Sequence, residues 1–253
     1  MPMASEAIRD YAVLLGDDSL ILGHRLSEWC SRGPFLEEDL ALSNTALDFI
    51  GRARMFYSYA AELSGSEVTE DFFAYQRDCR DFRNLLMCEL PNGDFAFTMA
   101  RQYLLDEFYC LFMAALAGST DEHLAGIAGK AVKESGYHLR RSREWMLRLG
   151  DGTAESHARL QQAFDELWGY TAEFWLVDDL EGLLVADGVA VDVGTLHEEW
   201  HRHVAATLVD ATIEMPVTEW SVSGGRKGVH TEALGHLLSD LQFVQKSYPG
   251  LEW

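Results

Sequence analysis

One stripe of apolar residues constrains the fold of this chain more than any other feature of the sequence. The stripe consists of Leu42, Ala46, Phe49, Ala53, Phe56, Ala60 and Leu63, and its spacing alternates between four and three residues. That alternation places every member on one face of an α-helix. Gly65 follows, and a glycine ends a helix easily because it adopts the left-handed conformation without steric cost. The stripe therefore predicts a long helix with one buried face.

The same period recurs along the rest of the chain. A second stripe contains Met99, Tyr103, Asp106, Cys110, Met113 and Ala117 and ends at Gly118. Ser119 and Glu122 have capping-box spacing, so they predict the start of a helix that ends at Gly150. We expect further helices at about residues 5–31, 68–89, 155–186, 192–214 and 231–247, the last with Thr231 as its N-cap. No strand pattern and no linker rich in Gly, Pro or Ser interrupts them, so we predict one all-α domain over residues 1–253, with four antiparallel core helices and accessory helices.

Charge and cysteine content argue against several classes of protein, namely nucleic-acid binders, membrane proteins and proteins with CxxC sites. The 20 basic and 41 acidic residues give a net charge of −21, and no basic stripe is present to bind nucleic acid or an anionic membrane surface. No apolar run is long enough for a membrane helix, and the N-terminus does not resemble a signal peptide. Cys30, Cys79, Cys88 and Cys110 show no CxxC spacing, which favours free thiols. We therefore expect a soluble cytoplasmic protein.

Asp106 and His138 are the most conspicuous polar residues, because each lies in the middle of an apolar stripe. An unpaired polar group in a helix core costs free energy. The two residues could form a structural hydrogen bond with each other, or His138 could bond to a backbone carbonyl. They could also belong to a metal site inside the bundle.

A di-iron bundle requires a Glu from each of two helices and a Glu-x-x-His motif from each of two others. This chain lacks such a pair of motifs. The only string with that spacing runs from Glu198 to His201, within His197-Glu198-Glu199-Trp200-His201. This string matches the H-E-x-x-H pattern of zinc proteases, but five residues match by chance fairly often and no third ligand follows at a suitable position. A metal site at His197 and His201 is thus an open alternative.

The segment Gly224-Gly225-Arg226-Lys227-Gly228 is a glycine-rich basic loop before the last helix. It lacks the spacing of a P-loop. The loop could contact an acidic partner, bind a phosphate group at the helix N-terminus, or simply cap the helix.

Several motifs together resemble one family, the PaaC-type structural subunits of the multicomponent ring-1,2-phenylacetyl-CoA epoxidase. The segments that carry the resemblance cover nearly the whole chain, and they are residues 20–30 (LILGHRLSEWC), 36–44 (LEEDLALSN), 47–54 (LDFIGRAR), 59–63 (YAAEL), 91–96 (PNGDFA), 133–140 (KESGYHLR), 224–232 (GGRKGVHTE) and 249–253 (PGLEW). Each motif alone is modest, but their order and spacing are specific.

The resemblance implies a ferritin-like bundle that pairs with a homologous catalytic subunit of the PaaA type. In that family the catalytic subunit holds the di-iron centre and the CoA thioester, and a reductase subunit supplies electrons from NADPH. A small bridging subunit is a further expected partner. The resemblance therefore implies that this chain is a non-catalytic subunit without a cofactor of its own. The alternative is an independent metalloenzyme, either a hydrolase or an oxidase.

By comparison with the motifs of the catalytic subunits, the six ligand positions of the di-iron centre fall on Leu20, Phe49, Arg52, Asp106, Ser135 and His138. Leucine and phenylalanine cannot bind a metal ion, and a guanidinium repels one. Only Asp106 and His138 keep ligand chemistry. A charge-assisted pair between Arg52 and Asp106 is a further expectation, because the cation could neutralise a buried acid in place of the metal.

Overall fold

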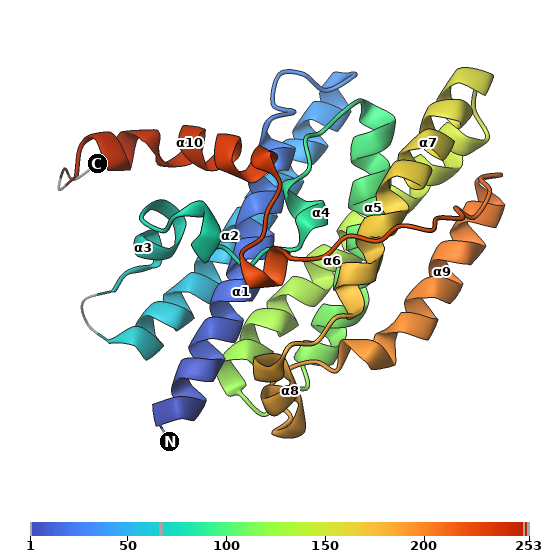
Figure 1. Ribbon diagram of the computed structural model, residues 1–253. Helices are drawn as coiled ribbons and strands as arrows, with labels where there is room; N and C mark the ends of the chain where they lie inside the picture. Colours follow the sequence, from blue (N-terminus) through green and yellow to red (C-terminus); the bar gives the residue numbers. More distant parts are fainter. Residues whose placement is uncertain (1, 66–67, 250, 252–253) are drawn as a thin grey trace. The chain divides into compact units, whose positions relative to one another are not determined.

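The computed structural model of the chain describes residues 2–65, 68–249 and 251. Helices account for all its regular elements, and the described residues contain no strand (Figure 1), so the predicted all-α class is confirmed. The chain divides into two compact units, unit 1 with residues 1–91 and 224–253 and unit 2 with residues 92–223. The single domain over residues 1–253 stays a prediction. Gly250, Glu252 and Trp253 of the C-terminal motif lie outside the described residues.

Unit 1 is built around two long helices, α1 and α2, that pack along each other (Figure 1). Their close approach depends on Gly23, where a Cβ atom would lie 2.9 Å from the Ile50 side chain and 3.1 Å from the Ala46 carbonyl oxygen. The stripe predicted on α2 is its buried face. The elements of unit 1 are α1 (Pro2–Ser27), α2 (Leu36–Ser64), α3 (Glu70–Tyr75), η1 (Cys79–Asp81), α4 (Leu86–Glu89), η4 (Gly225–Lys227) and α10 (Glu232–Ser247).

Unit 2 has a second pair of long helices, α5 and α6, with α7 and α9 packed on them. Its core is aromatic: Phe108, Phe174 and Trp200 lie within one cluster whose ring centroids are 4.9 to 6.0 Å apart. The elements of unit 2 are α5 (Phe95–Leu116), α6 (Glu122–Gly150), α7 (Ala154–Leu167), η2 (Trp168–Trp175), α8 (Asp179–Ala186), η3 (Val193–Leu196) and α9 (His197–Asp210). The four longest helices are thus two pairs, one in each unit.

The helix predicted at 68–89 is wrong, because the chain there forms α3, η1 and α4 with irregular turns between them. The backbone N–H groups of Arg83 and Leu85 donate to the carboxylates of Asp17 and Asp18 at 2.8 and 2.7 Å. In a continuous helix these N–H groups would bond to carbonyls four residues earlier. Two buried acids of α1 therefore take the backbone donors that helix formation would need.

Other helix boundaries also differ from the sequence prediction. The segment 155–186 is interrupted by the 3₁₀ turns of η2, α9 spans only His197–Asp210, and α1 ends at Ser27 rather than near residue 31. The N-cap of α6 is Asp121, whose carboxylate accepts from the Leu124 N–H, rather than Ser119. Thr231 does precede α10, but its side chain makes no capping hydrogen bond, and its own N–H donates to Glu89.

Candidate functional site

Asp106 lies at the centre of a buried polar cluster between α5 and α6 in unit 2. The Gln102 side-chain amide donates to Asp106 Oδ1 at 2.6 Å. Burial raises the pKa of Asp106 to about 6, and electrostatic interaction with His138 and hydrogen bonds from Ser142 and Gln102 limit that rise. The surrounding groups do not fully cancel the effect of burial, so the Asp106 carboxylate is able to gain a proton near neutral pH.

Ser135 and His138 lie on α6 and are also buried, so three of the six sequence-predicted positions belong to this one unit. Their burial on the apolar face of α6 agrees with the stripe from which they were identified. Electrostatic interaction with His138 opposes the rise in the pKa of Asp106, and the predicted hydrogen bond between these two residues stays a prediction.

Leu20, Phe49 and Arg52 form the part of the predicted set that belongs to unit 1. All three are buried, and the Arg52 guanidinium lies over the Phe49 ring at 4.8 Å from its centroid. This arrangement is a cation–π contact, which favours a buried arginine beside an aromatic face. The predicted pair between Arg52 and Asp106 joins residues of different units, and it stays a prediction.

These six residues do not fit a di-iron centre. Only Asp106 and His138 carry side chains that bind iron, while Leu20 and Phe49 have no donor atom and Arg52 is a cation. Two irons need several carboxylates, at least one of which bridges them. Among the residues that the structure describes, no group of three or more His, Cys, Asp or Glu side chains could hold a metal ion.

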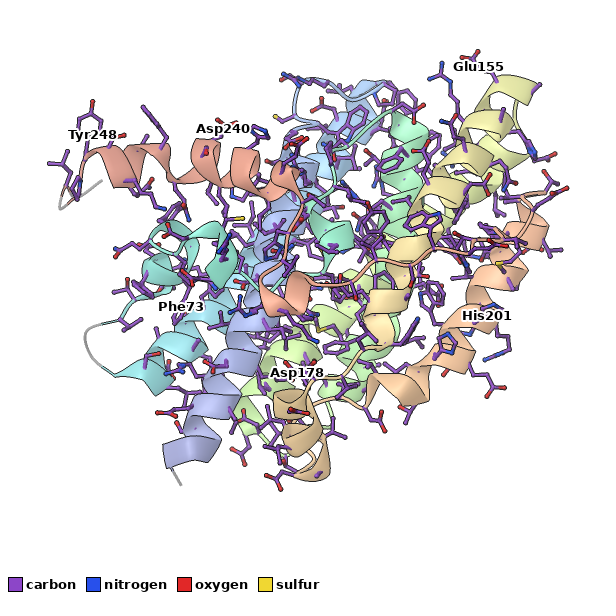
Figure 2. The ribbon with its side chains drawn as sticks, viewed as in Figure 1. Phe73, Glu155, Asp178, His201, Asp240 and Tyr248 are labelled. Atoms are coloured by element: carbon purple, nitrogen blue, oxygen red, sulfur yellow. The ribbon has the colours of Figure 1, made fainter. Side chains whose placement is uncertain are left out.

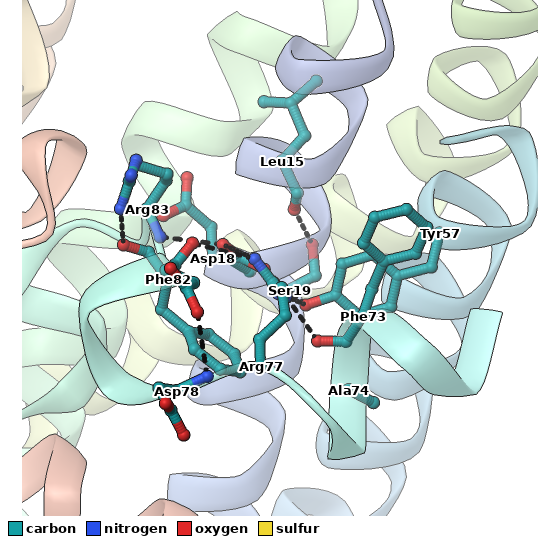
Figure 3. Close-up of polar contacts among 12 residues, drawn as sticks. Leu15, Asp18, Ser19, Tyr57, Phe73, Ala74, Arg77, Asp78, Phe82 and Arg83 are labelled. Atoms are coloured by element: carbon teal, nitrogen blue, oxygen red, sulfur yellow. Dashed lines mark hydrogen bonds and ion pairs between the residues drawn. The ribbon is translucent and has the colours of Figure 1, made fainter. Parts of the chain in front are cut away.

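A second set of buried acids, which the sequence did not bring to notice, lies in unit 1 and consists of Asp17, Asp18 and Glu89. Figure 3 shows Asp18 near Arg77, Tyr57 and Arg83, which surround this part of the set. Asp17 accepts from the Tyr57 hydroxyl at 2.6 Å, from the Arg83 N–H at 2.8 Å and from both terminal nitrogens of Arg77. The Arg77 guanidinium also lies over the Phe82 ring at 4.1 Å. Burial lowers the pKa of Arg77, but the Asp17 carboxylate more than offsets this, so the net shift is upward. Asp17 and Arg77 thus form a buried ion pair with further hydrogen bonds.

Asp18 fixes the glycine-rich loop to α1. The Arg226 guanidinium donates to both carboxylate oxygens of Asp18 at 2.8 Å and also to the Arg83 carbonyl oxygen at 2.7 Å. Burial raises the pKa of Asp18, and the Arg226 charge opposes that rise. This bidentate geometry is the strongest form of arginine–carboxylate pairing. Arg226 is therefore committed to a contact within the chain.

Glu89 holds the other end of the same loop. Its carboxylate accepts from the Thr231 N–H at 2.6 Å and lies 2.7 Å from His230 Nδ1, while His230 Nε2 lies 2.9 Å from the Phe82 carbonyl oxygen. Burial lowers the pKa of His230, but its bonds to Glu89 and Phe82 raise it more, so the net shift is upward. Both ring nitrogens face acceptors, so the geometry favours the imidazolium form.

The glycines of the loop are explained by the same packing. A Cβ atom at Gly225 would collide with the Asn84 carbonyl oxygen, and one at Gly228 with the Arg80 carbonyl oxygen. Gly228 also has a φ of 72°, which favours glycine. Of the five predicted loop residues, Lys227 alone is exposed, whereas Gly224, Gly225, Arg226 and Gly228 are at least half-buried. The predicted contact of this loop with a partner or CoA is untested, and Lys227 is the side chain available for it.

His197 and His201 lie on the first turns of α9, so the H-E-x-x-H pattern falls on a helix. Figure 2 labels His201 on this helix. The ring centroids of the two histidines are 6.3 Å apart, and both residues border a hollow of about 540 Å³ whose walls include Trp168, Trp175 and Trp200. His203, the nearest further histidine, is occupied by Glu107 at 2.7 Å. No third ligand joins His197 and His201 among the described residues, so the structure gives no support to the metalloenzyme alternative.

Two further expectations concern cysteines and membranes. Cys30, Cys79, Cys88 and Cys110 are free thiols. Among the described residues, no helix combines the length and apolar character needed to cross a membrane.

Comparison with known proteins gives two matches. A family model described as "Phenylacetic acid catabolic protein" matches residues 1–253. The chain is also 47% identical over 243 residues to an Escherichia coli (strain K12) protein that is named as one of the subunits of 1,2-phenylacetyl-CoA epoxidase. That alignment covers 96% of this chain and 98% of the bacterial protein.

Proposed function

Because the chain belongs to the family of phenylacetic acid catabolic proteins, we propose that it is the structural subunit of a phenylacetyl-CoA epoxidase. That enzyme is a multicomponent di-iron oxygenase that epoxidises the ring of phenylacetyl-CoA during phenylacetate degradation. The observation that carries the proposal is the 47% identity to an epoxidase component over 96% of the chain. The helical, ferritin-like class of the family agrees with the all-α structure.

The chain is non-catalytic in this proposal. Leu20, Phe49 and Arg52 stand at three of the six ligand positions, and all three are buried side chains that cannot bind iron. In place of ligands, an apolar side chain and an aromatic–guanidinium contact fill the core of unit 1 at these positions. Such packing favours a stable scaffold over an open metal site.

The partners follow from the same assignment. A PaaA-type catalytic subunit would hold the di-iron centre and the CoA thioester, and a reductase subunit would supply electrons from NADPH. A small bridging subunit would complete the complex. The complex would lie in the cytoplasm, where NADPH and CoA thioesters are available to it.

Iron analysis of the separate and combined subunits tests the non-catalytic role. The isolated chain, the catalytic subunit and their complex are each loaded with ferrous iron, desalted and analysed for bound metal. We expect iron near zero in this chain and a full complement in the complex. Two irons per isolated chain would contradict the proposal and make this chain an enzyme in its own right.

An Asp106→Asn variant adds a functional readout in the reconstituted complex. Asp106 is one of the two predicted ligand positions that keep ligand chemistry, so removing its charge would abolish turnover if the chain held a catalytic iron there. A scaffold tolerates the change, and epoxidation of phenylacetyl-CoA should stay within about twofold of the unmodified complex. Loss of a true iron ligand would instead reduce kcat by orders of magnitude.

A further inference from the structure

One face of α2 exposes a row of apolar residues with a regular spacing. Leu36, Leu40 and Leu47 are 69%, 55% and 65% exposed. By helical spacing, the partly buried Ser43 and the exposed Gly51 lie on the same row. We call Leu36, Leu40, Ser43, Leu47 and Gly51 the leucine seam. From Leu36 to Leu47 the spacing is four, three, four, which is the spacing of the contact positions in paired helices.

The seam is not needed for the core of unit 1. The opposite face of α2 is the buried one, and it includes Phe49, Ala53 and Phe56. Three leucines in one row on a helix of a folded domain are an exposed apolar patch, and such patches mark interaction surfaces. The seam is therefore a surface that a second helix could cover.

Gly51 gives the seam a point of close approach. A Cβ atom at this position would meet nothing within 4 Å, so packing within the chain does not require a glycine there. A glycine in the middle of a helix costs about 1 kcal/mol relative to alanine. The absence of a side chain lets the backbone of another helix come near α2 at this position.

Charges beside the seam indicate what kind of helix fits. By helical spacing, Glu37 and Asp48 border the seam on one side and Asp39 on the other. The cation Arg54, further along the same face, pairs with Glu70 at 3.1 Å. A second copy of this chain would bring the same acidic borders against these, and its net charge of −21 adds to the repulsion. A helix with an apolar row bordered by Lys or Arg would be complementary.

We propose that the leucine seam of α2 binds such a helix of the catalytic partner subunit. This inference rests on the proposed function, which makes the chain one subunit of a heteromeric complex. It adds the surface that the chain uses and the chemistry of the partner helix: apolar contact residues flanked by basic ones.

The test measures the affinity of the full-length chain for the full-length catalytic subunit by surface plasmon resonance. The variant carries Leu40→Glu and Leu47→Glu, which place two charges in the seam without touching the core of unit 1. The control is Leu183→Glu, which changes a leucine of α8 that is 68% exposed. Circular dichroism and thermal melts confirm that both variants fold.

We expect the seam variant to raise the Kd at least 100-fold, because central apolar contacts are each worth about tenfold or more in affinity. The control should stay within about threefold of the unmodified chain. Gly51→Leu should also weaken binding, by blocking the close approach. Size-exclusion chromatography with light scattering should show the isolated chain as a monomer.

The outcomes separate the two proposals. A stable complex that forms with unchanged Kd for the seam variant would overturn the seam while leaving the proposed function intact. Failure of the unmodified chain to bind the catalytic subunit at all would instead count against the proposed function. A homodimer of the isolated chain that Leu40→Glu and Leu47→Glu dissociate would show that the seam binds a second copy and would also overturn the inference.

Discussion

Asp17 of unit 1 and Asp106 of unit 2 are both fully buried acids on long helices, but their neighbours differ. Asp17 contacts the Arg77 guanidinium, the Tyr57 hydroxyl and a backbone N–H. Asp106 accepts a hydrogen bond from the neutral Gln102 amide, and burial raises its pKa to about 6. The comparison shows that the neighbours of a buried acid matter beside its burial: Asp17 lies in a buried ion pair, whereas the pKa of Asp106 is raised because His138, Ser142 and Gln102 only partly offset burial.

The difference also separates two kinds of position in the chain. Three buried acids of unit 1 each have a basic partner within the same unit: Arg77 for Asp17, Arg226 for Asp18 and His230 for Glu89. They hold the chain's own segments together. Asp106 lies in unit 2, where burial outweighs the interactions that would lower the pKa of its carboxyl group, so that pKa is raised.

The largest expected effect comes from breaking the pair in unit 1. Arg77→Met should lower the free energy of unfolding by about 3–5 kcal/mol, because it leaves the Asp17 carboxylate buried without its cation. Urea unfolding at pH 7 measures the loss. Arg202→Met is the control, since Arg202 is an exposed residue with an ion pair of 3.5 Å to Glu199 and should cost about 0.5 kcal/mol or less. Equal losses in the two variants would show that the buried Asp17–Arg77 pair contributes no more to stability than an exposed ion pair.

A smaller effect, of opposite sign, is expected at Asp106. The pKa of Asp106 is about 6 in the fold against 3.8 for the ordinary side chain, so the folded protein binds its proton more tightly and ionisation destabilises the fold as pH rises. Asp106→Asn removes that destabilisation. Relative to the unmodified chain, its free energy of unfolding should increase by roughly 1 kcal/mol between pH 5 and pH 8. A difference that does not change with pH would show that Asp106 titrates normally.

The smallest expected effect is the pH dependence at His230. Its pKa in the fold lies above the ordinary 6.5, so its contribution to stability is complete below that pH and declines as pH rises through the folded-state pKa. His230→Gln should therefore destabilise the chain more at pH 6 than at pH 9. His236→Gln, at an exposed histidine of the same unit, is the matched control for replacing an imidazole by an amide. A constant penalty at His230 would mean that the residue stays neutral.

Helices with an apolar stripe of regular spacing could be located from the sequence, as α2, α5, α6 and α10 show. The segment 68–89 could not, because contacts with other parts of the chain decide its course. Arg83 and Leu85 give their N–H groups to Asp17 and Asp18, which lie far away in the sequence. Helical period reports only local preference, and it does not report such long-range hydrogen bonds.

Some residues of the candidate site could be recognised from the sequence, and their partners could not. Asp106 and His138 were recognisable because each interrupts an apolar stripe, and both are buried. Asp17 and Asp18 interrupt the apolar run from Tyr11 to Leu22 and gave the same signal, which the sequence analysis did not use. Their partners could not have been identified from spacing, since Arg77 and Arg226 follow them by 60 and 208 residues.

The discontinuous make-up of unit 1 has a consequence for the order in which the protein folds on the ribosome. Residues 92–223 form a unit of their own and emerge before the segment that carries Arg226 and His230. Until that segment leaves the exit tunnel, Asp18 and Glu89 have no cation to neutralise them, and the nascent first unit cannot close over these acids. Unit 2 is therefore able to fold before unit 1 is complete, although residues 1–91 of unit 1 are translated before it.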